Sequence, residues 1–150
     1  MQVREIMTRD VTALAPSCSI AEVAQTMRHL DVGSIPLVQE GRLVGVITDR
    51  DITIRVVADG LDPHLEQAEM HMTRDPITVT PDTSTDEAGQ VMAREQIRRL
   101  PVVEQGRLVG YLALGDLALQ NKDKKVGQTL EQISEPSQPE GSARERGANR

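Results

Sequence analysis

The sequence predicts a mixed α/β fold of the α+β kind, built from two copies of one small unit. Met7-Thr8-Arg9-Asp10 recurs as Met72-Thr73-Arg74-Asp75, and the stretch 41–45 recurs as 106–110, at a constant offset of 65 residues. Each copy reads as strand, helix, strand, strand, helix (β-α-β-β-α). Because units this small cannot each bury a full apolar face alone, we expect the tandem copies to pack with pseudo-two-fold symmetry. With 38% hydrophobic residues, one Tyr and neither Phe nor Trp, the core must be aliphatic.

The first half of the first copy is expected to hold a short strand and an amphipathic helix. The strand is predicted over Val11–Ala15 and is ended by Pro16. Apolar residues then recur at helical spacing over 20–30 behind Ser19, which has the position of a helix cap. We expect Gly33 to end this helix.

A hairpin and a second helix complete the copy. Strands are expected over 35–39 and 42–48, joined at Glu40-Gly41, where glycine takes a positive φ freely. A helix is expected to start near Asp49. The second copy repeats the series with a strand over 77–80, a helix capped by Ser84, strands over 101–104 and 108–113, and a helix over 114–120.

The organisation expected along the chain has five parts. They are the first copy (1–60), a linker (61–70), the second copy (71–122), a C-terminal helix (123–134) and a mobile tail (135–150). The tail is expected because Pro, Ser, Gly, Glu and Arg dominate it and cannot bury enough surface to offset chain entropy.

Composition excludes several classes of function. The formal net charge of −6 argues against nucleic-acid binding, which needs Lys and Arg to neutralise phosphates. The lone Cys18 fits a reducing compartment, and no apolar run is long enough to cross a membrane, so a cytoplasmic protein is expected. His29, His64 and His71 lack metal-ligand spacing and are interpreted as surface residues, so no metal is expected.

The most informative motif is Gly45-Val-Ile-Thr48-Asp-Arg50-Asp51, where a strand ends and a helix begins. One interpretation is ribose binding, because a carboxylate accepts hydrogen bonds from vicinal hydroxyls and Arg50 can reach a phosphate. The other is a helix cap, because Thr-x-x-Asp before an apolar run is also a capping signature. The two interpretations do not exclude each other.

The doubled unit, the proline before a valine-rich strand and Gly-x-x-Thr-x-x-Asp resemble the cystathionine-β-synthase (CBS) domain pair, or Bateman module. The resemblance covers roughly residues 3 to 120, and Thr48-Asp-Arg-Asp-Ile52 is most similar to stand-alone bacterial pairs of the hypoxic-response type. It implies an adenosine-containing ligand (AMP, ADP, ATP, NAD(H) or S-adenosylmethionine) bound in clefts between the repeats. It also implies a homodimer, with helix faces carrying Ile52, Val56, Leu117 and Leu119 as the expected contact.

The resemblance also implies which residues form each cleft. The first cleft would join Thr48, Arg50 and Asp51 with Thr73, Ile77, Thr78, Ile97 and Arg98. The second would join Ala113 and Asp116 with Thr8, Thr12, Ala13, Val32 and Gly33.

The two copies differ at the residues that carry this chemistry. Ala113 stands where the first copy has Thr48, and Gly115 stands where it has Arg50. Arg98-Arg99 adds positive charge to the first cleft, although cations near a helix end also complement its dipole. We therefore expect the first cleft to be competent and the second to be weak or empty.

The sequence is compatible with three functions. The first is a regulatory module that binds an adenine nucleotide and signals by a conformational or dimer change, with no cofactor required. The second is a ligand-free dimeric scaffold, in keeping with the degenerate second motif. The third is an enzyme, which we do not expect, because the sequence shows no nucleophile paired with a base.

Overall fold

The structure, a computed structural model, describes residues 1–120 and Ile133. The expected C-terminal helix, apart from Ile133, and the expected tail lie outside the described residues. The chain divides into two compact units that do not coincide with the two copies. Of the residues up to 120, unit 1 contains 1–8, 79–102 and 110–120, and unit 2 contains 9–78 and 103–109.

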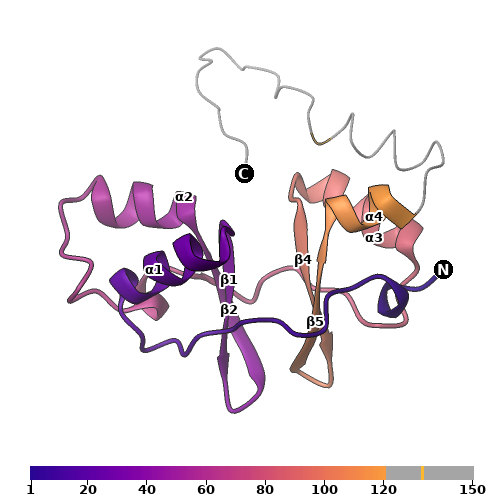
Figure 1. Cartoon of the computed structure of the whole chain (residues 1–150), viewed down its shortest axis with the longest axis horizontal. Helices are drawn as coiled ribbons and strands as arrows, with labels where there is room; N and C mark the ends of the chain where they lie inside the picture. Colours follow the sequence, from indigo (N-terminus) through magenta and orange to yellow (C-terminus); the bar gives the residue numbers. More distant parts are fainter. Residues whose placement is uncertain (121–132, 134–150) are drawn as a thin grey trace. The chain divides into compact units, whose positions relative to one another are not determined.

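Unit 2 places two helical segments against an antiparallel hairpin. In Figure 1, α1 and α2 lie on the same side of β1 and β2. Ser34 lies opposite Thr48 at the open end of the hairpin, and a register shift falls between Leu37 and Val38. The elements are α1 (Ile20–Leu30), β1 (Ser34–Gln39), β2 (Arg42–Thr48), α2 (Asp49–Ile52), a π-helix η2 (Thr53–Val57), a 3₁₀ turn η3 (Ala68–Met70) and β3 (Thr73–Arg74).

The remaining elements repeat this series. They are a 3₁₀ turn η1 (Val3–Glu5), α3 (Thr85–Glu95), β4 (Arg99–Glu104), β5 (Arg107–Ala113) and α4 (Leu114–Gln120). Both hairpin turns use positive φ angles, at Glu40-Gly41 (54° and 82°) and at Gln105-Gly106 (54° and 81°), as predicted. The combination of helices with antiparallel strands confirms the predicted fold class.

The helix starts were predicted correctly, and one helix end was not. The hydroxyls of Ser19 and Ser84 accept the backbone N–H of the residue three positions on, at 3.1 and 3.0 Å. The first helix, which Gly33 was expected to end, instead ends at Leu30, and Asp31 caps it in the left-handed conformation (φ 58°). Aspartate tolerates this conformation because its short polar side chain bonds locally. Gly33 instead accepts the N–H of Asp49 at 3.0 Å.

The predicted strands over 11–15 and 77–80 are wrong as regular strands. Each contributes one parallel bridge, Leu14 to Leu37 and Val79 to Val102. In the first copy, Leu14 donates to Pro36 and accepts from Val38. Extending this parallel ladder in either direction would require an N–H from Pro36 or from Pro16, and proline has none. The second copy carries Pro101 and Pro81 at the matching positions, so the same limit applies.

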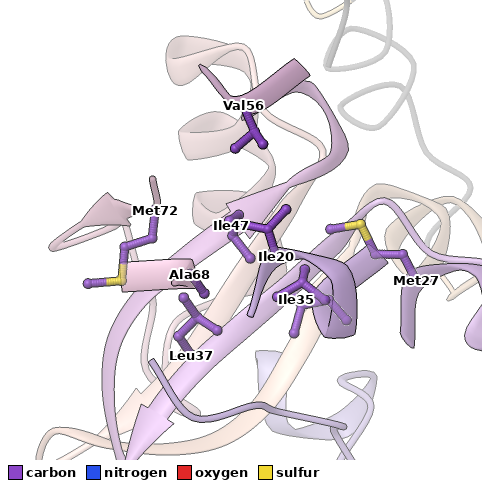
Figure 2. Packing of buried hydrophobic residues seen from close by; sticks show 9 residues of the cluster. Ile20, Met27, Ile35, Leu37, Ile47, Val56, Ala68 and Met72 are labelled. Carbon is purple, nitrogen blue, oxygen red and sulfur yellow. The ribbon is translucent and has the colours of Figure 1, made fainter. Parts of the chain in front are cut away.

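The core is aliphatic, as composition predicted. In unit 2, Figure 2 shows side chains from the helices and the hairpin meeting between them. Val56 and Leu117, which we expected on a face available to a dimer partner, are instead fully buried, whereas Leu119 is 74% exposed. The buried cluster of unit 2 is Ile20, Val23, Met27, Ile35, Leu37, Ile47, Val56, Ala68 and Met72.

The first residues of each copy pair with the second hairpin strand of the other copy. Thr73 in β3 lies opposite Val46, and Thr8 exchanges backbone hydrogen bonds of 2.9 Å with Tyr111. Gly45 and Gly110 make this approach possible. A Cβ on Gly45 would lie 2.3 Å from the Met72 sulfur and 2.8 Å from the Thr73 carbonyl oxygen.

This packing predicts opposite effects for two glycine-to-alanine changes. Gly45→Ala should lower the free energy of unfolding by about 1–3 kcal/mol, because the methyl group meets backbone that cannot yield cheaply. Gly115→Ala should raise it by about 0.5 kcal/mol, because that glycine lies in α4 and a Cβ placed on it would meet no atom within 4 Å. Urea denaturation measures both, and equal effects would contradict the role given to Gly45.

Candidate functional site

The candidate site begins where β2 ends and α2 starts. The Thr48 hydroxyl accepts the Asp51 N–H at 3.1 Å, and the Asp51 Oδ2 accepts the Thr48 N–H at 2.9 Å. These reciprocal bonds form a capping box that satisfies two backbone donors at the strand-to-helix junction. The helix-cap interpretation of the Thr-x-x-Asp motif is therefore confirmed. A ligand could use only the hydrogen-bonding groups of Thr48 and Asp51 that the box leaves without a partner.

The carboxylate of Asp51 is buried but only half satisfied. Asp51 is 8% exposed, and its Oδ2 is taken by the capping bond. Its Oδ1 accepts no hydrogen bond from the described residues and faces the Arg55 Nε at 3.9 Å. Because buried polar atoms are nearly always hydrogen-bonded, this oxygen is a candidate acceptor for a ligand hydroxyl. The Thr48 hydroxyl, which uses its oxygen in the box, still has its proton to donate.

Arg55 is the residue that sequence reasoning missed. Its Nη1 donates to the His71 carbonyl at 3.2 Å, while its Nε faces Asp51. The available signal was the spacing of Asp51 and Arg55, which places opposite charges one helical turn apart. Arg50, by contrast, is exposed, and its side chain makes no hydrogen bond or ion pair with the part of the chain that is described.

The second copy keeps only part of this arrangement. Asp116 Oδ2 accepts the Ala113 N–H at 2.9 Å, which matches the bond between Asp51 and Thr48. Ala113 has no hydroxyl, so the reciprocal bond is missing. Gln120 stands where the first copy has Arg55.

The other predicted residues of the first cleft divide between the units. Thr73, Ile77 and Thr78 are exposed and belong to unit 2, together with Thr48, Arg50 and Asp51. Asp75 precedes Ile77 and Thr78 with a positive φ of 48°, which turns the chain after β3. Ile97 and Arg98 belong to unit 1, where the Arg98 carbonyl accepts the Leu114 N–H at 2.8 Å.

The residues predicted for the second cleft divide in the same way. Thr8, Ala113 and Asp116 belong to unit 1, whereas Thr12, Ala13, Val32 and Gly33 belong to unit 2. Gly33 lies against the helix start of its own unit, because a Cβ on it would be 3.0 Å from the Asp49 Oδ2. An anionic side chain therefore adjoins this position, where the second copy has Arg98.

Cys18 and the histidines are the other chemically reactive groups that the sequence singled out. Burial, reinforced by Glu22, raises the pKa of the Cys18 thiol to about 11, which keeps it protonated at neutral pH. His71 is wrong as a surface histidine: its side chain is 11% exposed and its Nε2 lies 2.8 Å from the Glu66 Oε1. Within residues 1–120 and Ile133, no three His, Cys, Asp or Glu side chains gather as metal ligands would.

Comparison with known proteins agrees with this architecture. The CBS domain model matches residues 3–58 and 68–120. The chain belongs to the CBS domain family. The CBS domain-containing protein YhcV of Bacillus subtilis (strain 168) is 42% identical over 133 residues, covering 88% of this chain and 94% of that relative. Hypoxic response protein 1 of Mycobacterium tuberculosis is 36% identical over 135 residues, covering 89% and 94%.

Solved CBS structures extend the comparison to ligands. The crystal structure of Hypoxic Response Protein I with two coordinated zinc ions matches with a TM-score of 0.74 at 36% identity, covering 80% of this chain and 98% of that one. The CBS pair of protein MJ0100, solved with 5′-methylthioadenosine and S-adenosylmethionine, matches with a TM-score of 0.72 at 28% identity, covering 83% and 98%. No helix among the described residues has the length and apolar character needed to span a membrane.

The unequal capping boxes predict unequal stability effects. Thr48→Ala should lower the free energy of unfolding by about 1 kcal/mol, because it leaves the Asp51 N–H without its partner. Ala113→Thr should raise it by about 0.5–1 kcal/mol by completing the second box. Both are measured by urea denaturation, and a destabilising Ala113→Thr would show that the second junction cannot accept the reciprocal bond.

Proposed function

We propose that this CBS pair is a regulatory module that binds an adenosine-containing ligand through Asp51. The observation that carries the proposal is the buried Asp51 Oδ1, which keeps its acceptor capacity beside the donor hydroxyl of Thr48. A sugar diol supplies two hydroxyl donors and one or more acceptors, and it fits this pair. Arg50, exposed and one residue before Asp51, is the cation that we propose to meet a phosphate.

The full binding site in this proposal is the first cleft that the family resemblance implies. Thr73 supports it most directly, because its strand pairs with β2 two residues before Thr48. The proposed ligand-binding residues are Thr48, Arg50, Asp51, Thr73, Ile77, Thr78, Ile97 and Arg98.

The second cleft is proposed to bind weakly or not at all. It keeps the acceptor of Asp116 but lacks a hydroxyl at Ala113 and a cation at Gly115. In addition, the Asp49 carboxylate lies over Gly33, where it would repel a phosphate. Its proposed residues are Thr8, Thr12, Ala13, Val32, Gly33 and Asp116.

The ligand class proposed is AMP, ADP, ATP, NAD(H) or S-adenosylmethionine. The MJ0100 pair, with its two adenosine compounds, supports the adenosine moiety, and the arginines of this chain favour a phosphorylated member. In this proposal the protein is a cytoplasmic regulator and not an enzyme. Binding would shift the equilibrium between two conformations, or between monomer and homodimer, provided that the ligand binds one state more tightly than the other.

A ligand-free dimeric scaffold is the second candidate. The observation that favours it is that both aspartates already serve as structural caps, so neither is retained only for a ligand. In this case the chain would act through a protein partner, with the clefts empty.

The proposed function predicts a ligand response that depends on Asp51. At 100 times the Kd, AMP should stabilise the protein by about 2.7 kcal/mol, which raises the Tm by roughly 5–10 °C. Asp51→Asn should cut this shift to about half or less, because the amide still caps the helix but presents a donor in place of Oδ1, and losing a hydrogen bond to a charged group weakens binding by roughly 10- to 100-fold. The matched Asp116→Asn should retain it. ATP, NADH and S-adenosylmethionine are compared in the same thermal-shift experiment.

The scaffold alternative makes a different prediction for native mass spectrometry. It expects a dimer with no bound adenosine compound even at millimolar ligand. A copurifying or added nucleotide retained at one per chain would eliminate it.

A further inference from the structure

The side chain of Arg55 connects two parts of unit 2 that are far apart in the sequence. On one side its Nε lies 3.9 Å from the Asp51 Oδ1, and on the other its Nη1 donates to the His71 carbonyl at 3.2 Å. The Arg55 side chain is 48% exposed, whereas its two partners are largely buried. An arginine can hold both contacts at once because its donors form a rigid planar fork.

The residues around His71 form a tether segment, defined as residues 66–74. The segment is anchored at one end where Ile20 N–H donates to the Glu66 carbonyl at 2.9 Å, and at the other where β3 pairs with β2. Between these anchors, the His71 imidazole lies 2.8 Å from the Glu66 carboxylate. The tether segment carries Thr73 and leads directly to Ile77 and Thr78.

The helix that carries Arg55 changes from α-helical to π-helical part-way along. Asp49–Ile52 is α-helical, and Thr53–Val57 is a π-helix, whereas α4 is α-helical from Leu114 to Gln120. Short π-helical segments occur frequently at functional sites, because they redirect the side chains that follow. The position matching Arg55 is Gln120, which carries no charge.

We propose that Arg55 is a positioning residue that couples ligand binding at Asp51 to the order of the tether segment. The inference rests on the proposed function, which supplies the ligand at Asp51. Arg55 holds the Asp51 Oδ1 as an oriented anion, and a diol bound to that oxygen in turn fixes the guanidinium that donates to His71. Because coupling between two sites is reciprocal, an ordered tether segment also favours binding.

Amide hydrogen exchange of the full chain, followed by mass spectrometry, tests this coupling with AMP as the probe. The variants are Arg55→Gln, which copies the second repeat, and Arg55→Lys, which keeps the charge and loses the fork. Arg28→Gln is the control, because Arg28 is an exposed cation on α1 whose side chain makes no ion pair among the described residues. Each protein is measured without ligand and at its own saturating AMP concentration.

The proposal expects AMP to slow exchange in the tether segment of wild type and of Arg28→Gln. Arg55→Gln should bind AMP about tenfold more weakly, as expected for losing one charge-assisted contact, and should show no slowing at saturation. Arg55→Lys should recover part of the affinity but not the slowing. Slowing in Arg55→Gln equal to that of wild type would overturn the coupling, and so would full recovery of both properties in Arg55→Lys.

The measurements without ligand separate this inference from the proposed function. In ligand-free protein, Arg55→Gln should speed exchange over residues 71–74 several-fold, because the His71 carbonyl loses its donor. An unchanged rate would overturn the positioning role even where AMP binds. Absence of any AMP response in wild type, together with faster exchange in ligand-free Arg55→Gln, would overturn the nucleotide function and the coupling while leaving the contact between Arg55 and the tether segment intact.

Discussion

The reciprocal hydrogen bonds between Thr48 and Asp51 are the interaction on which the candidate site depends. They fix the angle at which α2 leaves β2, and they bury a carboxylate that would otherwise be solvated. Burying an ionised carboxylate is costly unless its oxygens are satisfied, and here the box satisfies one oxygen and leaves the other facing Arg55. One oxygen of this side chain therefore has a structural role, and the other is the one proposed to bind a ligand.

The duplicated chain distributes this arrangement unevenly. Each copy places an aspartate at the start of its second helix, and each aspartate accepts the N–H three residues earlier. Only the first copy adds a hydroxyl, a following cation at Arg50 and the bridging Arg55. Gly45 and Gly110 remain equivalent, because each lets the first residues of the other copy contact its strand closely. The two copies thus share the residues that close packing requires, and they differ at the residues of the proposed ligand site.

Much of the framework could be predicted because its signals are local. Ser19 and Ser84 cap helices, and the two Gly-containing turns form hairpins, since each of these features depends on a few adjacent residues. The prediction of a strand at Val11–Ala15 was wrong because Pro36 and Pro16 lack the N–H groups that would extend the ladder beyond one bridge. This limit depends on two segments together and not on either one alone. That signal was present in the sequence, as both prolines recur in the second copy.

The candidate site was predictable only in part for the same reason. Thr48 and Asp51 lie three residues apart, so their contact follows from the start of a helix. The contact of Arg55 with the His71 carbonyl depends on tertiary packing and on a π-helix, neither of which has a reliable signature in a single sequence. The burial of His71 was not predictable because its partner Glu66 lies in the expected linker, whereas the tether segment packs into unit 2.

The claim that Asp51 binds a sugar diol is tested most directly by comparing AMP with 2′,3′-dideoxy-AMP in calorimetric titrations of wild type and Asp51→Asn. If the Oδ1 of Asp51 accepts a ribose hydroxyl, removing the diol should weaken binding to wild type by roughly 10- to 100-fold, the value of a hydrogen bond to a charged group. The same comparison in Asp51→Asn should then show little difference between the two ligands. Equal affinity of wild type for AMP and its dideoxy analogue would contradict the account, because the buried oxygen would then serve the fold alone.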